Sequence, residues 1–385
     1  MRCRAVPAPC RVSPLVSLAS ALACLLAPQL AAAQPRDELS TAMYVRIDTD
    51  DTTVISPYVR AAKKLAESTG ASATYTADIW TSASVDIRSS ASVQPVRPVT
   101  EQRDELDLAL TQEVEDLSLK GAYRFSSEHD YTSHGVMLDG AFAFADKAAT
   151  LSLALKGLFD TVGQAGDPSF QRSLSTMDAA LSFTQVIDPH MFAQATYEIA
   201  HSSGYQASPY RWVGVGPGAT GFGCVGAQPC VRERVPDART RNALALMLRR
   251  ALSDSISLGA GYRYYFDDWG LGSHTVLAEL GWNLGSAALL LLRYRFYTQT
   301  QVDFYQAQYP QLAVDAYRTR DRELSPMSYH RIGADFHYDV DLRADKARLT
   351  FALSAGGNFY TYDDFVGLSS AQALELTGAL TLSLL

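Results

Sequence analysis

The sequence predicts an all-β fold, a transmembrane antiparallel up-and-down β-barrel of about sixteen strands. The C-terminal segment gives the clearest reason, because leucines fill one set of alternate positions and polar residues fill most of the other. The leucines are Leu374, Leu376, Leu380, Leu382 and Leu384. A two-residue period places the two sets on opposite faces of a strand. Similar segments recur from about residue 42 onward, and their apolar face is too rich to be the wet face of a soluble sheet, which favours a membrane barrel.

The N-terminus explains how such a chain would reach a membrane. Arg2, Arg4 and Arg11 precede an apolar run over about residues 12–30, which ends in three alanines at 31–33. This arrangement is typical of a secretory signal peptide. We therefore expect residues 1–33 to be a signal peptide and residues 34–385 to form one barrel domain. The prolines inside the apolar run disfavour the alternative, a permanent membrane anchor.

Composition excludes several other classes of protein. The chain has 385 residues and a formal charge of −8, which becomes −11 without the leader because the leader contains three arginines and no acidic residue. A general affinity for nucleic acid is therefore not expected. No apolar stretch after the leader approaches the roughly 20 residues that a spanning helix needs. A closed sheet is the other structure that lipid tolerates, so the sequence predicts a barrel in contact with the lipid of the bacterial outer membrane.

The strands are placed wherever polarity alternates with a period of two. The predicted strands cover residues 42–50, 53–66, 71–83, 102–112, 116–126, 133–145, 148–161, 174–187, 190–201, 240–252, 255–266, 273–284, 287–300, 327–342, 346–360 and 372–384. Sixteen is an even number, as single-chain bacterial barrels have. The first two segments and the region around Tyr210 leave fourteen strands as the alternative.

The lengths of the breaks support this order. Short breaks, such as 146–147 and 285–286, alternate with longer ones, of which 84–101, 202–239 and 301–326 are the longest. In outer-membrane barrels the short turns are periplasmic and the long loops extracellular. With the C-terminus on the periplasmic side, every long break falls on the outer side.

Parity also assigns the faces of each strand. In the segment 255–266, Ile256, Leu258 and Tyr262 share one face while Ser257 and Arg263 share the other. A charge on the lipid face at mid-membrane would cost about 2 to 4 kcal/mol, so the charged sets should point into the lumen. The residues expected to line the lumen are Lys120, Arg124, Lys156, Arg249, Arg263, Glu279, Arg293, Arg295, Asp335, His337, Asp339, Arg348 and Glu375.

The mixture of signs leaves two interpretations of the lumen open. It can be an aqueous pore with a transverse field, or a lumen closed by ion pairs. The arginines of segment 287–300 are expected to face acids on neighbouring strands, such as Glu279. The simpler interpretation is that the lumen charges form structural ion pairs. The more specific one is that they select the solutes that pass.

Two cysteines remain after the leader, Cys224 and Cys230, in a glycine-rich segment. In an oxidising envelope they predict a disulfide that stiffens one exposed loop. Their spacing is not Cys-x-x-Cys and no histidine is near, which disfavours a metal pair or a redox dithiol. The acids at 48, 50 and 51 lack the glycine and glutamate of a calcium loop, so we expect solvated loop acids. No metal site and no cofactor is predicted.

Three segments at the rim could have a chemical role. Glu128, His129, Asp130 and Tyr131 could form an acid/base dyad. Adjacent strand residues point to opposite faces, so His129 and Asp130 should not meet, which disfavours catalysis. Asp267 and Asp268 could contact a ligand, although hydrogen bonds within a tight hairpin are the simpler reading. Residues 318–325, with alternating charges, could fold inward as a constriction or remain a solvated loop.

Several strings resemble a bacterial outer-membrane family catalogued as a domain of unknown function. They are YRYYFDDWGLGSHTVLAEL at 262–280, RYRFYTQTQVDFY at 293–305, RDRELS at 320–325, YRWV at 210–213 and RTRNAL at 239–244. The resemblance covers most of the mature chain and implies a porin-like or uncharacterised barrel. It also suggests work beside flavin or cytochrome proteins of the envelope. No catalytic residue is implied.

The sequence thus predicts an integral outer-membrane barrel that is not an enzyme. It would act as a porin-like passive channel for small hydrophilic solutes, or as a structural barrel, with a mixed-charge lumen. The alternative is a membrane anchor or scaffold that docks redox proteins of the envelope.

Overall fold

Sixteen long strands form the body of the protein. The computed structural model describes residues 36–84, 98–216, 230–311, 313, 315–342 and 346–384. The first nine strands are β1 Glu38–Asp48, β2 Thr52–Lys64, β3 Thr69–Ser82, β4 Val99–Val114, β5 Leu117–Ser127, β6 Tyr131–Phe144, β7 Ala149–Val162, β8 Arg172–Asp188 and β9 Met191–Gly204. The other seven are β12 Ala238–Ala251, β13 Ile256–Asp267, β14 Gly272–Leu284, β15 Ala288–Gln299, β16 Met327–Leu342, β17 Ala347–Tyr362 and β18 Ser370–Leu384.

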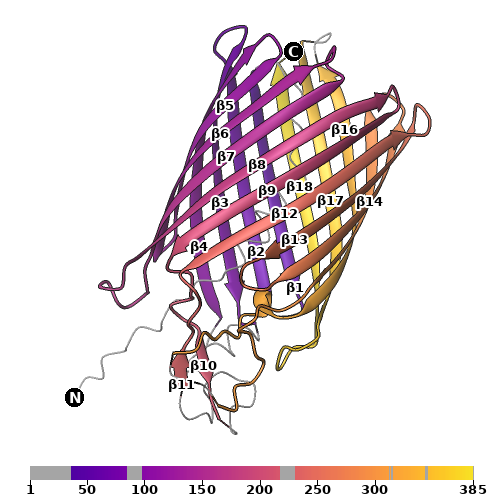
Figure 1. Cartoon of the computed structure of the whole chain (residues 1–385). Coiled ribbons are helices and arrows are strands. Elements are labelled where there is room, and N and C mark those ends of the chain that lie inside the picture. Colours follow the sequence, from indigo (N-terminus) through magenta and orange to yellow (C-terminus); the bar gives the residue numbers. More distant parts are fainter. Residues whose placement is uncertain are drawn as a thin grey trace.

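The strands close into an antiparallel up-and-down barrel (Figure 1). Each strand pairs with the next in sequence, and β9 pairs directly with β12. The ring closes where β1 pairs with β18, with Arg46 opposite Glu375. A closed ring leaves no strand edge exposed to lipid, where an unpaired edge would be costly.

The two faces of the wall differ in the way that the two-residue period predicts. Along β13, Ile256, Leu258 and Tyr262 are exposed on the outer surface, whereas the residues between them are shielded. On β17 the outward Leu353 is 62% exposed. Large apolar side chains thus cover the outside of the barrel, where lipid would surround them.

Turn lengths separate the two ends of the barrel. The turns at one end are short, such as 145–148 between β6 and β7 and 285–287 between β14 and β15. The C-terminal strand β18 ends at this side, at the top of Figure 1. The long connections 205–237 and 300–326 both lie at the opposite end. In a membrane barrel this second end is extracellular, and we call it the outer mouth.

The long connections have structure of their own at the outer mouth. Two short strands, β10 Trp212–Gly214 and β11 Cys230–Arg232, form a separate sheet that hangs below the barrel in Figure 1. A single turn of 3-10 helix, η1 Arg322–Leu324, lies at the rim of the barrel. Backbone bridges join 205–237 to 300–326, for example between Arg234 and Arg318.

The largest buried apolar cluster of the described chain also lies at the outer mouth. It joins strand ends to loop residues from four connections. Its buried members are Val235, Trp269, Leu271, Val302, Tyr305, Met327, Tyr329, Tyr362, Phe365 and Ala371. The hydroxyl of Tyr305 donates to the carbonyl oxygen of Asp364 at 2.6 Å, which ties the last two outer loops together. The outer loops therefore pack as a small core against the mouth.

The strand predictions are confirmed, including the sixteen-strand count and the first two strands. The predicted ends of the strands differ from the observed ones by a few residues. For example, β1 begins at Glu38 rather than at 42. The sequence did not indicate β10, β11 or η1, which have three residues each and no measurable period. None of the helices in the described ranges is long and apolar enough to cross a bilayer. The predicted signal peptide, residues 1–33, lies outside the described residues.

Candidate functional site: a charged cavity inside the barrel

A cavity of about 630 Å³ lies inside the barrel, toward the outer mouth. Its walls come from β1 to β4 on one side, from β12 and β14 to β18 on the other, and from η1. Within the described chain its charged lining consists of Arg46, Arg103, Arg293, Arg295, Arg322 and Arg331 with Asp78, Glu128, Glu279, Glu323, Asp335 and Glu375. The two signs are equal in number, so the cavity has charged walls without a large net charge.

A network of ion pairs crosses the wall from β12 to β16. Arg249 contacts the carboxylate of Glu279, whose other oxygen accepts from Nε of Arg293 at 3.1 Å. Nη1 of Arg293 also lies 2.6 Å from Oδ2 of Asp335. Gly259 makes room for this network, since a Cβ there would stand 3.0 Å from a carboxylate oxygen of Glu279. Arg293 is thus held between two acids, as the sequence predicted for Glu279.

A second pair crosses from β16 to β18. Nε of Arg331 lies 3.0 Å from Oε2 of Glu375, two strands away. The guanidinium lies flat on the wall, because a Cβ at Gly333 or Gly356 would come within 2.8 and 2.9 Å of its nitrogens. Gly333 and Gly356, which are paired on adjacent strands, therefore leave the space that the Arg331 guanidinium occupies against the backbone.

The other charged residues predicted for the lumen also form pairs. Arg124 contacts Asp107 at 2.7 Å, Lys120 contacts Asp139 at 3.5 Å, and Lys156 contacts Asp178 at 3.6 Å. Arg263 contacts Glu198 at 3.5 Å, and Arg348 contacts Asp341 at 2.8 Å and Asp339 at 3.8 Å. His337 stands between Leu289 and Ala352 in the register of β15 to β17.

Five of the residues named from the sequence line the cavity itself: Glu279, Arg293, Arg295, Asp335 and Glu375. The sequence argument missed Arg46, Arg103 and Asp78, which line it from the opposite wall. For Arg46 the signal was present, because on β1 it alternates with the exposed Met43 and Ile47. Arg322 and Glu323 come from a loop, where no period exists to place them.

The segment predicted as either a constriction or a solvated loop does fold inward. Arg320, Asp321 and Arg322 are buried, and Arg322 borders the cavity. Nη1 of Arg322 lies 2.7 Å from Oδ2 of Asp50, at the end of the hairpin between β1 and β2. The expectation that the acids near position 50 are solvated is therefore wrong for Asp50, because Arg322 compensates its charge in a buried position.

A buried charge cluster fastens the two long loops to each other. Arg211 lies 2.7 Å from Asp321 and 3.4 Å from Glu233. The hydroxyl of Thr319 donates to Glu233 at 2.5 Å. Burial raises the pKa of Glu233, while Arg211 opposes that shift. Residues 86 to 110 positions apart in sequence thus share one buried polar cluster.

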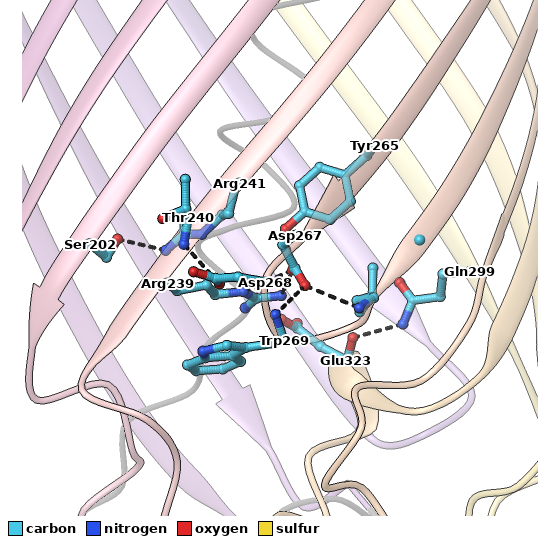
Figure 2. Close-up of polar contacts among 12 residues, drawn as sticks. Ser202, Arg239, Thr240, Arg241, Tyr265, Asp267, Asp268, Trp269, Gln299 and Glu323 are labelled. Atoms are coloured by element: carbon cyan, nitrogen blue, oxygen red, sulfur yellow. Dashed lines mark hydrogen bonds and ion pairs between the residues drawn. The ribbon is translucent and has the colours of Figure 1, made fainter.

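The family-like string around Asp267 forms the hairpin between β13 and β14 (Figure 2). The fully buried carboxylate of Asp267 accepts from the backbone N–H groups of Trp269 and Leu271, each at 3.0 Å, and from the hydroxyl of Tyr265 at 2.6 Å. Arg239 pairs with the same carboxylate at 2.5 Å and lies over the Trp269 ring. The Trp269 indole N–H donates to the carbonyl of Ala238. These contacts are structural and support the hairpin reading.

Figure 2 also shows contacts of neighbouring strand ends and of the inward segment at this rim. Asp268 accepts from the backbone N–H of Thr240 at 2.9 Å, and Arg241 donates to Ser202 at 2.7 Å. The side-chain amide of Gln299 donates to the carbonyl of Glu323 at 2.8 Å. Strand ends from β9 to β15 and η1 therefore form one hydrogen-bonded rim.

The candidate dyad at the rim does not assemble. His129 is exposed, whereas Asp130 accepts from the hydroxyl of Tyr210 and from the N–H of Ala165. Glu128 borders the cavity from the loop after β5. Burial raises the pKa of Glu128 to about 7, against the opposing effect of Arg103. Glu128 can therefore titrate near neutral pH.

The predicted disulfide stays a prediction, because Cys224 lies outside the described residues. Within the described ranges, no group of three or more His, Cys, Asp or Glu side chains could hold a metal ion.

The closed sixteen-strand barrel with an apolar exterior defines the class of the protein, a bacterial outer-membrane β-barrel. The chain belongs to the family described as protein of unknown function (DUF3570), whose model matches residues 86–176 and 171–379. This confirms the resemblance seen in the sequence. No curated protein matches the chain.

Solved structures share the fold at low identity. A bacterial polysaccharide outer membrane secretin is 8% identical, with a TM-score of 0.50 over 91% of this chain and 98% of that one. OprD of Pseudomonas aeruginosa is 11% identical, with a TM-score of 0.43 over 91% and 95%. The CymD monoaromatic hydrocarbon channel is 10% identical, with a TM-score of 0.42 over 98% and 94%. Such similarity concerns the fold alone.

Proposed function

We propose that the protein is a porin-like passive channel for small hydrophilic solutes and that it catalyses no reaction. The observation on which this depends is the cavity of about 630 Å³, lined by charged residues of both signs, inside a closed, lipid-compatible wall. That volume accommodates a small organic molecule. Barrels of sixteen or more strands of the porin type leave an aqueous channel.

The charges of the wall support a filtering role. Arginines and carboxylates alternate around the cavity, and most of those on the strands pair with each other along the wall. We propose that these residues, together with the pairs of β5 to β8, line the path of the solute. Fixed charges of both signs favour hydrated polar solutes over apolar ones.

The rim residues support a passive role rather than a catalytic one. Asp130 is engaged by Tyr210, and His129 points to solvent without an acidic partner among the described residues. A general acid/base pair needs its members within hydrogen-bond reach of one another or of one reacting group.

Conductance of the purified protein in planar lipid bilayers tests the proposal. We expect ohmic current steps in KCl for the native barrel. Ser354→Trp, which adds a large side chain to the cavity wall, should reduce the step size, whereas Ala355→Trp on the outward face should leave it unchanged. Inserted, folded barrels that stay electrically silent would contradict a channel.

The alternative is an anchor that docks redox proteins of the envelope. It predicts that a flavoprotein or a cytochrome copurifies with the native barrel from its own membrane. A barrel that conducts no current and copurifies with such a protein would support the anchor instead of the channel.

A further inference from the structure

One arginine of the cavity differs from the others in its partners. Six arginines line the cavity in the described chain. Five of them have a carboxylate within ion-pair distance: Arg46 has Asp48, Arg103 has Asp78, Arg293 has Glu279 and Asp335, Arg322 has Asp50, and Arg331 has Glu375. For Arg295, no carboxylate of the described residues lies within that distance. Its positive charge is therefore uncompensated by the wall.

Two further donors stand beside Arg295 at the same level. Arg331 is directly opposite it on β16, and Asn358 is directly opposite Arg331 on β17. Neighbouring strands are about 4.8 Å apart, so the three residues span about 10 Å of wall. Like charges directly opposite each other destabilise a sheet, unless an anion lies between them.

Two of these side chains also have buried N–H groups without an acceptor. They are Nε of Arg295 and Nδ2 of Asn358, neither of which has a hydrogen-bond partner in the part of the chain that the structure describes. Asn358 is only 3% exposed. Buried donors without acceptors are uncommon in native proteins and call for an explanation.

The two arginines are held in place before any solute arrives. The guanidinium of Arg295 lies 5.5 Å from the centre of the Tyr329 ring, which supports it from one side. Arg331 rests on Gly333 and Gly356 and is fixed by Glu375. Such preorganisation lowers the entropic cost of binding.

We propose that Arg295, Arg331 and Asn358 form a binding site for the carboxylate of a small monocarboxylate solute. A planar carboxylate matches the fork of the arginine guanidinium and accepts two N–H groups at once. The solute should carry a single negative charge, because only the charge of Arg295 lacks a carboxylate partner among the described cavity arginines. A second negative charge on the solute would be repelled by Glu375 and Asp335, which border the same cavity. The inference rests on the proposed channel function, for which it names the class of solute.

Titration calorimetry on the folded barrel in detergent tests this site, with sodium benzoate and its neutral analogue benzamide as probes. Benzoate should bind at least about tenfold more tightly than benzamide, and Arg295→Gln should weaken benzoate binding by about tenfold or more. Arg348→Gln is the matched control, because Arg348 pairs with Asp341 and lies outside the cavity. It should leave benzoate binding unchanged.

Arg295→Lys keeps the positive charge but loses the planar fork of the guanidinium, so it should weaken benzoate binding by less than Arg295→Gln does. Each variant is shown to be folded if it migrates more slowly in a denaturing gel after heating than before. Equal binding of benzoate and benzamide, no binding of benzoate, or equal losses in Arg295→Gln and Arg348→Gln would overturn the site. Calorimetry needs no conduction, so the two proposals fail separately. A silent barrel that binds benzoate contradicts the channel alone, and a conducting barrel that ignores benzoate contradicts the site alone.

Discussion

The cavity wall and the outer mouth use the same pairing of arginine with carboxylate in different surroundings. In the wall, the Arg293 side chain is 25% exposed beside Glu279 and Asp335. At the mouth, Arg211 and Glu233 are 5% and 2% exposed. A pair beside water contributes little to stability, whereas breaking a buried pair is costly. The wall charges are therefore suited to act on solutes, and the mouth charges hold loops together.

The apolar contacts differ in the same way. The wall is one layer thick, so its outward side chains meet lipid and its inward ones meet the cavity. At the mouth, Val302 and Tyr305 from the loop 300–326 pack with Trp269 and Tyr362 in a core of their own. The loops 205–237 and 300–326 thus form a small globular cap at the outer mouth. Changes in the cap and changes in the barrel wall should have separable effects.

The largest effect is expected from breaking the buried cluster of the cap. Arg211→Met removes the guanidinium between Glu233 and Asp321 and leaves two buried carboxylates close together. Loss of one partner of a buried ion pair costs about 3 to 5 kcal/mol. We expect the loops to detach while the barrel stays folded, so trypsin should cut within 205–237 much faster. Unchanged proteolysis would show that the cap does not depend on this cluster.

A somewhat smaller effect is expected at the hairpin where cap and wall meet. Asp267→Asn weakens the contact with Arg239 and the buried hydrogen bonds around it, which should cost about 2 to 4 kcal/mol. The measurement is the urea midpoint of unfolding, followed by tryptophan fluorescence. Asp268→Asn is the control, and its single bond to Thr240 should cost about 1 kcal/mol or less. Equal losses in both variants would contradict the central place of Asp267.

A third effect, on ion selectivity, is expected from the titration of Glu128, which borders the cavity of the wall. Burial raises the pKa of Glu128 to about 7 in the folded protein, from an ordinary value of 4.5. Between these values the folded state keeps a proton that the unfolded state has released, so this group lowers stability as pH rises toward 7. Above pH 7 the ionised carboxylate adds a negative charge to the cavity.

Reversal potentials in a KCl gradient measure this effect. Selectivity for K⁺ over Cl⁻ should rise between about pH 6 and pH 8, and Glu128→Gln should abolish that rise. Persistence of the same step in Glu128→Gln would assign the titration to another group.

The smallest effect is expected for an exposed pair in the cap. Arg234 and Asp315 lie 3.2 Å apart with side chains 47% and 94% exposed. Arg234→Met should change stability by no more than about 1 kcal/mol and leave proteolysis of the loops close to that of the native protein. A loss as large as that of Arg211→Met would remove the distinction between buried and exposed pairs on which the comparison depends.

The sequence could predict the wall because each strand is under one local constraint. Lipid on one side and polar groups on the other impose a two-residue period, which placed Leu258 outward and Arg263 inward without knowledge of their neighbours. Pairing in a closed ring of consecutive strands then brought Glu279 next to Arg293. Fold and face thus follow from local sequence.

The cap could not be predicted in the same way. Arg211, Glu233 and Asp321 come from two loops, and their contact depends on how those loops fold together rather than on any period. That Arg295 has no carboxylate partner among the described residues was equally hidden. Parity places this residue in the lumen, but only its neighbours in the folded chain show that, among the described residues, the other five cavity arginines each have a carboxylate.

Accessibility of introduced cysteines tests most directly the claim that the inward face borders water and the outward face borders lipid. Ser354 borders the cavity and Ala355, the next residue on β17, is outward. In outer membranes treated with a charged, membrane-impermeant thiol reagent, Ser354→Cys should react rapidly and Ala355→Cys slowly, relative to the background of the native chain. Equal rates, or faster reaction of Ala355→Cys, would contradict the account.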